Sequence, residues 1–300
     1  MSRLFTAAAS DRIVFPGSAS SSPLSVSVWF RLTSQPGSGA GFVLIGTGTG
    51  STLLIGYRIA YENVGGTPNV YKLTFVASTV SAFNPPTRYA VTLGAALTLN
   101  QWYHLVWTWD RTASPYTRVC YLDSVSQTVV TESGGLDGPN VSSWGNTYLG
   151  ALLNTDNVTY VWPLDGAIAE PMVLQGVAIL TQREVTALYR GAYFVELRPQ
   201  SEYFGAWPLE GLFDPEPDWS GNGRHSTSIS GTSGSSNPPT AWYPPLIPSY
   251  PLELSSGSGS FDAAVAVLVE PTAAVAIVPA PSCPAYTGNA SRPPEPETGV

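Results

Sequence analysis

Strict alternation of apolar and other residues dominates the first half of this 300-residue chain. In the stretch 25–32, every second residue is large and apolar, namely Val26, Val28, Phe30 and Leu32. The residues between them are Ser25, Ser27, Trp29 and Arg31. Successive side chains of a β-strand point to opposite faces, so a period of two residues predicts a strand with one face buried. A chain built from such stretches folds into sheets.

Further strand-like stretches follow at near-regular spacing, separated by joints that contain glycine or proline. They span residues 42–45, 51–59, 71–77, 89–93, 102–109, 119–123, 128–131, 147–152 and 168–174. The Gly-rich joint at 46–51 is expected to be a hairpin loop. Many short strands of this kind predict an all-β fold with two packed antiparallel sheets. We expect one such sandwich over residues 1 to about 251, with Trp102, Val106 and Val28 buried.

One helix signal interrupts the strand pattern. Thr181 and Glu184 have the spacing of a capping box, and Gly191 can supply the left-handed C-terminal cap. The sequence therefore predicts one short helix between them, which we expect to cover an edge or end of the sandwich.

The composition changes after Arg198. Prolines prevent long strands there, so residues 199–254 are expected to be a mostly irregular Pro- and Trp-rich extension on the sandwich, anchored by Trp207, Trp219 and Trp242. The run SSGSGS at 255–260 has the composition of a flexible linker. Beyond it, the stretch AAVAVLVEP at 263–271 is followed by a similar stretch, AAVAIVPAP, at 273–281. We therefore predict three parts, namely a sandwich at 1–198, the extension at 199–254, and a linker with an extended assembly tail at 255–300.

The tail is expected to connect the chain to partners, because apolar stretches of this kind cannot bury themselves. Its candidate assembly contacts are Val265, Val267, Val269, Val275 and Ile277.

Charge excludes several classes of function. Only 11% of the residues are charged, against ~25% in typical soluble domains. The net charge of −8 lies in the last third, where residues 199–300 hold 2 basic and 10 acidic side chains. Nucleic-acid binding needs a basic patch, so no nucleic-acid partner is expected. No stretch predicts a membrane span, and the N-terminal residues lack a signal peptide, which predicts synthesis in the cytoplasm.

Catalytic and metal-binding candidates are few. Asp214, Glu216 and Asp218 alternate, but Pro215 and Pro217 stand between them, so they are interpreted as an exposed acidic turn rather than a catalytic pair or a calcium loop. His104 is expected to be a core residue of its strand, and His225 to lie in a turn. The two cysteines, Cys120 and Cys283, have neither metal-site nor disulfide spacing. No cofactor is predicted.

Glycan binding needs exposed aromatic side chains beside polar groups. Five residues in predicted loops could supply them: Trp144, Asn146, Asp156, Asn157 and Tyr160. Their competing interpretation is structural, because a sandwich of this size uses most of its tryptophans and tyrosines in packing.

Several segments resemble the laminin-G-like and concanavalin A-like jelly-roll family, of the type found in phage virion and bacterial surface proteins. They are QWYHLVWTWD at 101–110, Tyr121 to Asp123 before a polar turn, GAIAEPMVLQGVAILTQREVTALY at 166–189, and YFGAWPLEGLFDPEPDWSGNGRHSTS at 203–228. The resemblance implies a two-sheet antiparallel jelly roll with a late strand leading into a short helix. It specifies the fold more closely than the function, because one fold hosts lectins, glycosidases and structural modules.

The resemblance and the tail together favour a non-enzymatic structural protein of a virion or similar surface assembly, such as a head decoration, fibre or tail component. The expected partners are other assembly proteins and copies of the chain itself, with cell-surface glycans as possible ligands. The alternative is a glycan-binding adhesin module, and a glycosidase ranks third because paired carboxylates are lacking.

Overall fold

A computed structural model of the chain describes residues 2–17, 23–47, 56–78, 87–110, 112, 117–133, 145–153, 160–176, 179–192, 197–209 and 213–235. The chain divides into two compact units, Met1–Ile247 and Pro248–Val300, and every described residue belongs to the first. The predicted tail therefore lies outside the described residues, and the predicted divisions at 198 and 254 stay predictions.

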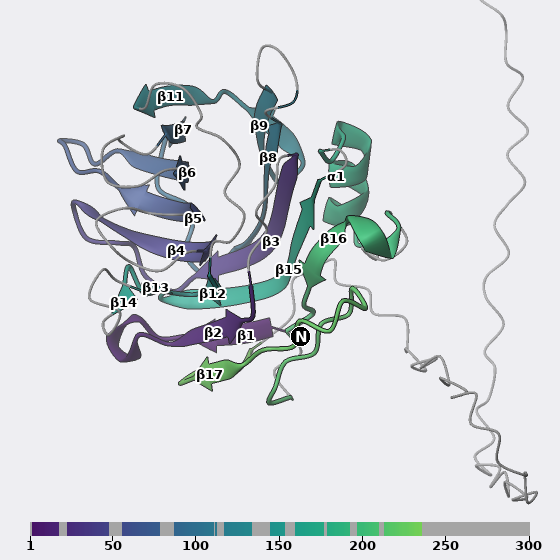
Figure 1. The fold of residues 1–300 in the computed structure, drawn as a ribbon. Helices are drawn as coiled ribbons and strands as arrows, with labels where there is room; N and C mark the ends of the chain where they lie inside the picture. The colour runs from purple at the N-terminus through teal and green to yellow at the C-terminus, as the bar shows by residue number, and fades with distance from the viewer. Residues whose placement is uncertain are drawn as a thin grey trace, which may run out of the picture. The chain divides into compact units, whose positions relative to one another are not determined.

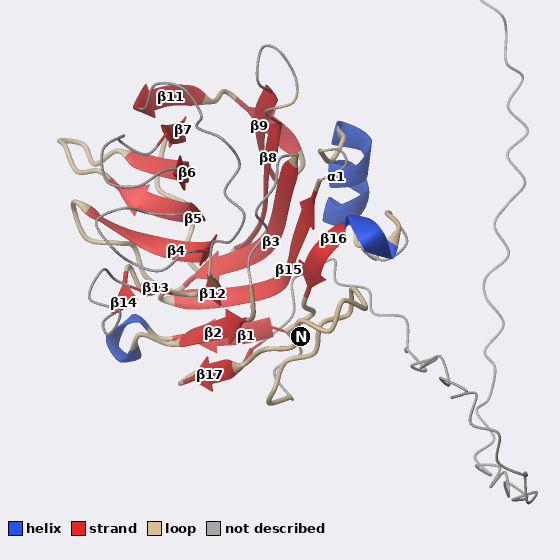
Figure 2. Ribbon diagram, viewed as in Figure 1, coloured by secondary structure: helices blue, strands red, loops and turns tan. Residues whose placement is uncertain are grey.

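The first of two large antiparallel sheets contains the strands predicted from the clearest alternation (Figures 1 and 2). Its order is β10 (Val125–Gln127), β9 (Thr117–Leu122), β8 (Trp102–Asp110), β3 (Leu24–Leu32), β15 (Gly166–Gln175), β1 (Ser2–Phe5) and β18 (Ser233–Ser235), with β16 (Tyr203–Ala206) paired to β15. Strands from both ends of the described chain thus close one side of this sheet.

The second sheet faces the first across the core. Its order is β11 (Val130–Ser133), β7 (Thr87–Leu93), β6 (Tyr71–Ser78), β5 (Gly56–Asn63), β4 (Ala40–Thr47), β12 (Thr147–Leu149), β2 (Arg12–Phe15) and β17 (Ser228–Ser230). All strand pairs are antiparallel, and two packed sheets of this kind confirm the predicted jelly-roll sandwich.

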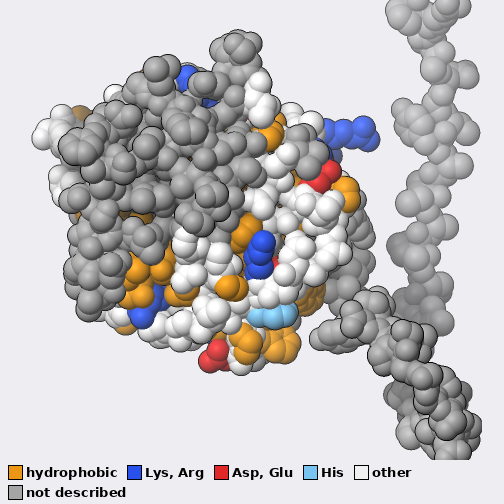
Figure 3. Space-filling view, in the orientation of Figure 1, with side chains coloured by type: hydrophobic (Ala, Val, Ile, Leu, Met, Phe, Trp, Pro, Cys, Tyr) orange, Lys and Arg blue, Asp and Glu red, His pale blue; other side chains and the backbone are white. Residues whose placement is uncertain are grey.

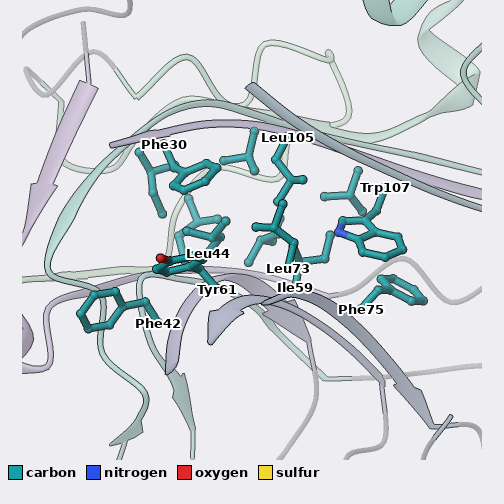
Figure 4. Packing of buried hydrophobic residues seen from close by; sticks show 14 of the residues in the cluster. Phe30, Phe42, Leu44, Ile59, Tyr61, Leu73, Phe75, Leu105 and Trp107 are labelled. Atoms are coloured by element: carbon teal, nitrogen blue, oxygen red, sulfur yellow. The ribbon is translucent and has the colours of Figure 1, made fainter. Parts of the chain in front are cut away.

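Large apolar side chains fill the space between the sheets (Figure 4). Phe30, Leu105 and Trp107 point inward from β3 and β8 toward side chains of β4, β5 and β6, among them Leu44 and Phe75. The Phe75 and Trp107 rings stack with centroids 5.8 Å apart. Burial of this much aromatic and aliphatic surface is the main source of stability for such a fold.

Strand β3 is buried on both faces, not on one as the alternation predicted. Val28 contributes to the core between the sheets, whereas the opposite face of the strand is covered by helix α1 (Gln182–Tyr189). The Trp29 ring stacks on Tyr189 at 5.7 Å between centroids. The alternation along β3 therefore separates two buried faces. One face carries large apolar residues, and the other carries serines and Trp29.

Helix α1 forms where the capping box predicted it. The Thr181 hydroxyl accepts a hydrogen bond from the Glu184 amide, Glu184 reaches back to the Thr181 amide, and Gly191 has a φ of 90° after the last turn. Val185 and Leu188 pack against Val106 on the outer face of the first sheet, so the helix covers a sheet face and not an edge. Within the described part of the chain, no helix is long and apolar enough to span a membrane.

Some boundaries differ from the predictions. Gly46 lies inside β4, and the rest of the predicted hairpin loop at 46–51, apart from Thr47, is outside the described residues. The stretch 147–152 is interrupted at Gly150, whose φ of 79° turns the chain between two short strands. Trp102 is only half-buried, while Val106 and Val28 are fully buried as predicted.

The segment after Arg198 contributes to the core. Trp207 is completely buried and stacks on Phe15 with ring centroids 4.2 Å apart. Trp219 is half-buried, and Trp242 lies outside the described residues. A tryptophan from the extension thus helps to fill the space between the two sheets.

Candidate functional site

An arm made of β13 (Leu152–Leu153), β14 (Tyr160–Val161) and Trp162 packs on the outer face of the second sheet, beside β4 and β12 (Figure 1). The Val43 amide donates a 2.9 Å hydrogen bond to the Trp162 carbonyl. Val14, Val43 and Tyr148 form the buried floor under the arm. The arm holds two aromatic side chains, Tyr160 and Trp162, half-exposed above the sheet.

Two glycines of β4 make room for this arm. A Cβ at Gly41 would lie 2.9 Å from the Trp162 ring, and one at Gly46 would lie 3.2 Å from the Leu152 side chain. The first distance is below any real Cβ contact, so the arm can lie this close only because position 41 has no side chain.

Arg12 stacks on the first aromatic side chain of the arm. Its guanidinium carbon lies 3.7 Å from the centroid of the Tyr160 ring, and its Nη1 donates to the Ser10 carbonyl at 3.3 Å. The Tyr148 ring lies 6.4 Å from that of Tyr160, and the exposed Asn146 side chain hydrogen-bonds to Tyr148. We call Arg12, Asn146, Tyr148 and Tyr160 the aromatic–arginine cluster.

Burial raises the pKa of Tyr148, so its hydroxyl is neutral at physiological pH and can both donate and accept hydrogen bonds. The cluster therefore combines an aromatic face, a hydroxyl, an amide and a fixed positive charge within one small area.

A second arginine stacks on the other aromatic side chain of the arm. The Arg58 guanidinium lies 3.9 Å from the Trp162 ring centroid. Its Nη2 lies 3.3 Å from Oε1 of the buried Glu62, which also accepts from Arg88 Nη2 at 2.5 Å and from Thr74 Oγ1 at 2.7 Å. Burial lowers the pKa of Arg58 to about 10, although the charge of Glu62 opposes this shift. Arg58 thus belongs to a network of ion pairs, whereas Arg12 has no ion pair among the described residues.

Of the predicted glycan-binding residues, Asn146 and Tyr160 come together in this cluster, although they are separated in sequence. Trp144, Asp156 and Asn157 lie outside the described residues. Arg12 and Tyr148 were missed, because only the pairing of β2 with β12, which sets Val14 opposite Tyr148, brings them beside the arm.

The acidic segment at 214–218 is not the exposed turn that the sequence predicted. Asp214 is exposed, but Glu216 is completely buried and Asp218 is nearly so. Glu216 Oε1 accepts from Arg3 Nε at 2.5 Å. Asp218 accepts hydrogen bonds from the backbone amides of Ala206, Ser220 and Arg224 at 2.9 to 3.1 Å. The alternation that looked like an acidic surface in fact turns two carboxylates inward.

These contacts close the free edge of β16. Besides Asp218 at the Ala206 amide, Asn222 Nδ2 donates to the Tyr203 carbonyl at 2.8 Å and Arg224 Nε to the Phe204 carbonyl at 2.9 Å. An open edge exposes unpaired backbone groups and invites association, so the segment has an evident structural role.

His104 is a core residue, as predicted. It is 1% exposed, its Nε2 lies 2.8 Å from Ser27 Oγ, and burial lowers its pKa to about 3. His225 was predicted to lie in a turn, but it is exposed in irregular backbone, where its Nδ1 accepts from the Asp218 amide at 3.0 Å. Cys120 is buried, and among the described residues no three His, Cys, Asp or Glu side chains gather as metal ligands.

The outer surface carries few charges. Figure 3 shows isolated basic and acidic side chains on one face, among polar groups and small gatherings of apolar side chains. Arginines also stack on rings elsewhere in the described residues, at Trp102, Tyr89 and Phe204. In the aromatic–arginine cluster the stacked ring is half-exposed and lies near an exposed amide, and no described carboxylate forms an ion pair with Arg12. This cluster is the candidate functional site.

Comparisons with known proteins agree with this architecture. A proposed carbohydrate-binding protein from Bacteroides ovatus has a TM-score of 0.50 and 15% identity, covering 79% of this chain and 60% of that one. A heptameric SAP-like pentraxin from Limulus polyphemus has a TM-score of 0.48 and 13% identity, covering 63% of this chain and 81% of that one. No curated protein sequence matches the chain. A family model matches residues 7–186, and the chain therefore belongs to the concanavalin A-like lectin/glucanases superfamily.

Proposed function

We propose that this chain is a non-catalytic glycan-binding module whose ligand lies at the aromatic–arginine cluster. The observation that carries the proposal is that Tyr160, Asn146 and Arg12 meet above the buried Tyr148 ring on the outer face of the second sheet. A saccharide has apolar C–H faces that pack on aromatic rings and hydroxyls that need polar partners, and the cluster offers both.

The fold supports this proposal. The Bacteroides ovatus neighbour is described as a proposed carbohydrate-binding protein, and the superfamily is named for lectins as well as glucanases. One fold hosts several functions, so the fold is compatible with glycan binding, while the side chains of the cluster are the specific support for it.

The contacts of three buried acidic side chains support a non-catalytic role. Glycoside hydrolysis uses two carboxyl groups that flank the scissile bond. Glu216 is paired with Arg3 in the interior, Glu62 is paired with Arg58 and Arg88, and Asp218 holds three backbone amides. None of these three carboxylates is available to a substrate.

A glycan array of the full chain tests the proposal. We expect binding that is lost in the Tyr160→Ala variant, because the ring is the aromatic face of the cluster. Trp102→Ala is the matched control, since Trp102 is also half-buried and also carries an arginine, Arg31, at 5.3 Å, but on the first sheet. Binding that survives Tyr160→Ala and disappears in Trp102→Ala would place the ligand elsewhere.

We further propose that the module serves in a virion or similar surface assembly, as a head decoration, fibre or tail component. Support comes from the resemblance of its sequence to such proteins and from the repeated apolar stretches at 263–271 and 273–281, which lie outside the described residues. Electron microscopy of the purified full-length chain should show regular oligomers or attachment to particles, and monomers throughout would contradict this role.

A further inference from the structure

We infer that the ligand of the aromatic–arginine cluster carries a negative charge, a carboxylate or sulfate on a sugar, which Arg12 binds. The inference rests on the proposed function and narrows it to anionic saccharides.

Arg12 has donors to spare. A guanidinium has five N–H groups, and among the described residues Arg12 uses them only for the Ser10 carbonyl, with Nε buried and unpaired. Among the described residues, the adjacent Asp11 forms no ion pair with Arg12, and its Oδ2 accepts instead from the Thr6 amide at 2.8 Å. The ion pairs recorded among the described residues involve other arginines, among them Arg3, Arg58, Arg88 and Arg198.

The stack on Tyr160 fixes the guanidinium in place. A cation over an aromatic ring is attracted by the electrons of the ring face, and the ring restricts the rotamers of a long side chain. A pre-positioned guanidinium loses less entropy on binding and can bind a planar carboxylate through two parallel hydrogen bonds. Half-burial of Arg12 also strengthens its attraction for an anion relative to a fully hydrated charge.

The surrounding charges favour the same ligand. Among the described residues, the charged side chains on the strands of this face are Arg12, Arg58, Lys72 and Arg88 against Glu62 and Glu132. These four positive and two negative groups sum to +2, whereas the whole chain carries −8. An excess of positive charge on one face of an acidic protein concentrates anions there.

Isothermal titration calorimetry of the full chain at low salt tests the inference with matched probes. Polygalacturonate and hyaluronan supply carboxylates, and dextran sulfate supplies sulfates. The neutral counterparts are methyl-esterified polygalacturonate, carboxyl-reduced hyaluronan and dextran. We expect at least one acidic polymer to bind at least tenfold more tightly than its neutral counterpart, and the class that does so identifies the anion.

The Arg12→Gln variant should lose this preference, while Arg31→Gln, which alters the arginine over Trp102, should keep it. The comparison of acidic and neutral probes on the unchanged protein does not depend on either variant folding. Equal affinity for all acidic and neutral pairs, with glycan-array binding retained, would overturn the inference and leave the proposed function standing. Loss of array binding altogether would overturn both.

Discussion

Arg3 Nε lies 2.5 Å from Glu216 Oε1, although 213 residues separate them in the sequence. The two side chains are 8% and 0% exposed, so this is a buried ion pair. Arg3 belongs to β1 and also donates to the Phe213 carbonyl. The pair therefore connects β1 to the segment that closes the edge of β16.

Removing one partner of this pair should be far more damaging than removing both. We expect Glu216→Met to lower the free energy of unfolding by about 3–5 kcal/mol, because the Arg3 charge stays buried without a counter-charge. The double variant Arg3→Met with Glu216→Met should lose less, since no charge remains. Urea unfolding measures both, and equal losses in the single and double variants would show that the ion pair is not what matters here.

The Asp218→Asn variant should be less stable than the unchanged protein, whereas the Asp214→Asn variant should not. Asp218 accepts from three backbone amides, and an amide nitrogen in place of one oxygen leaves at least one of these N–H groups unpaired, at about 1–3 kcal/mol. Asp214 is exposed, and its substitution should stay within ~0.5 kcal/mol. Thermal and urea unfolding of the two variants would contradict this account if they gave the same stability.

Stability should fall on acidification because of His104. Burial holds its pKa at about 3 in the folded protein, against ~6.5 in the unfolded chain, so between these values the unfolded state binds a proton that the folded state does not. The contribution is complete above pH 6.5 and is lost as the pH falls toward 3. Between pH 7 and pH 5 the loss should be about 2 kcal/mol.

Comparison with His104→Gln isolates this effect from the other titrating groups. Urea unfolding of both proteins at pH 7 and pH 5 should show a pH dependence that is smaller in the variant by about the same amount. An identical pH dependence in both proteins would mean that His104 is already protonated or solvated in the fold.

Truncation after residue 254 should separate folding from assembly. We expect the shortened chain to keep the β-sheet circular dichroism spectrum, because every described residue precedes this point. It should lose the oligomers or particle attachment of the full chain, as measured by light scattering. If the truncated protein assembles like the full-length chain, the contacts lie on the sandwich and not in the tail.

Much of the fold could be predicted from local patterns. Alternation located the strands around Val28 and Leu105, and the pair Thr181 and Glu184 located the helix, because both signals depend on neighbouring residues. Strands as short as β17 and β18 have no such signal. They are stabilised by pairing, β17 with β2 and β18 with β1, rather than by their own sequence.

The candidate site was harder to predict, because its members meet only through the sheet topology. Tyr160 and Asn146 were found as polar and aromatic loop residues, but the place of Arg12 depends on the pairing of β2 with β12. The error at Glu216 and Asp218 has a similar cause. Prolines between acidic residues indicate irregular backbone, and nothing local shows that Arg3 and the amides of residues 206, 220 and 224 will bind the carboxylates.

A crystal structure of the full chain with a saccharide that binds on the array tests the central claim most directly. We predict that the sugar lies against Tyr160 and Asn146 on the outer face of the second sheet, with its anionic group on the Arg12 guanidinium. A sugar bound at any other surface, with the aromatic–arginine cluster free of ligand, would contradict the account.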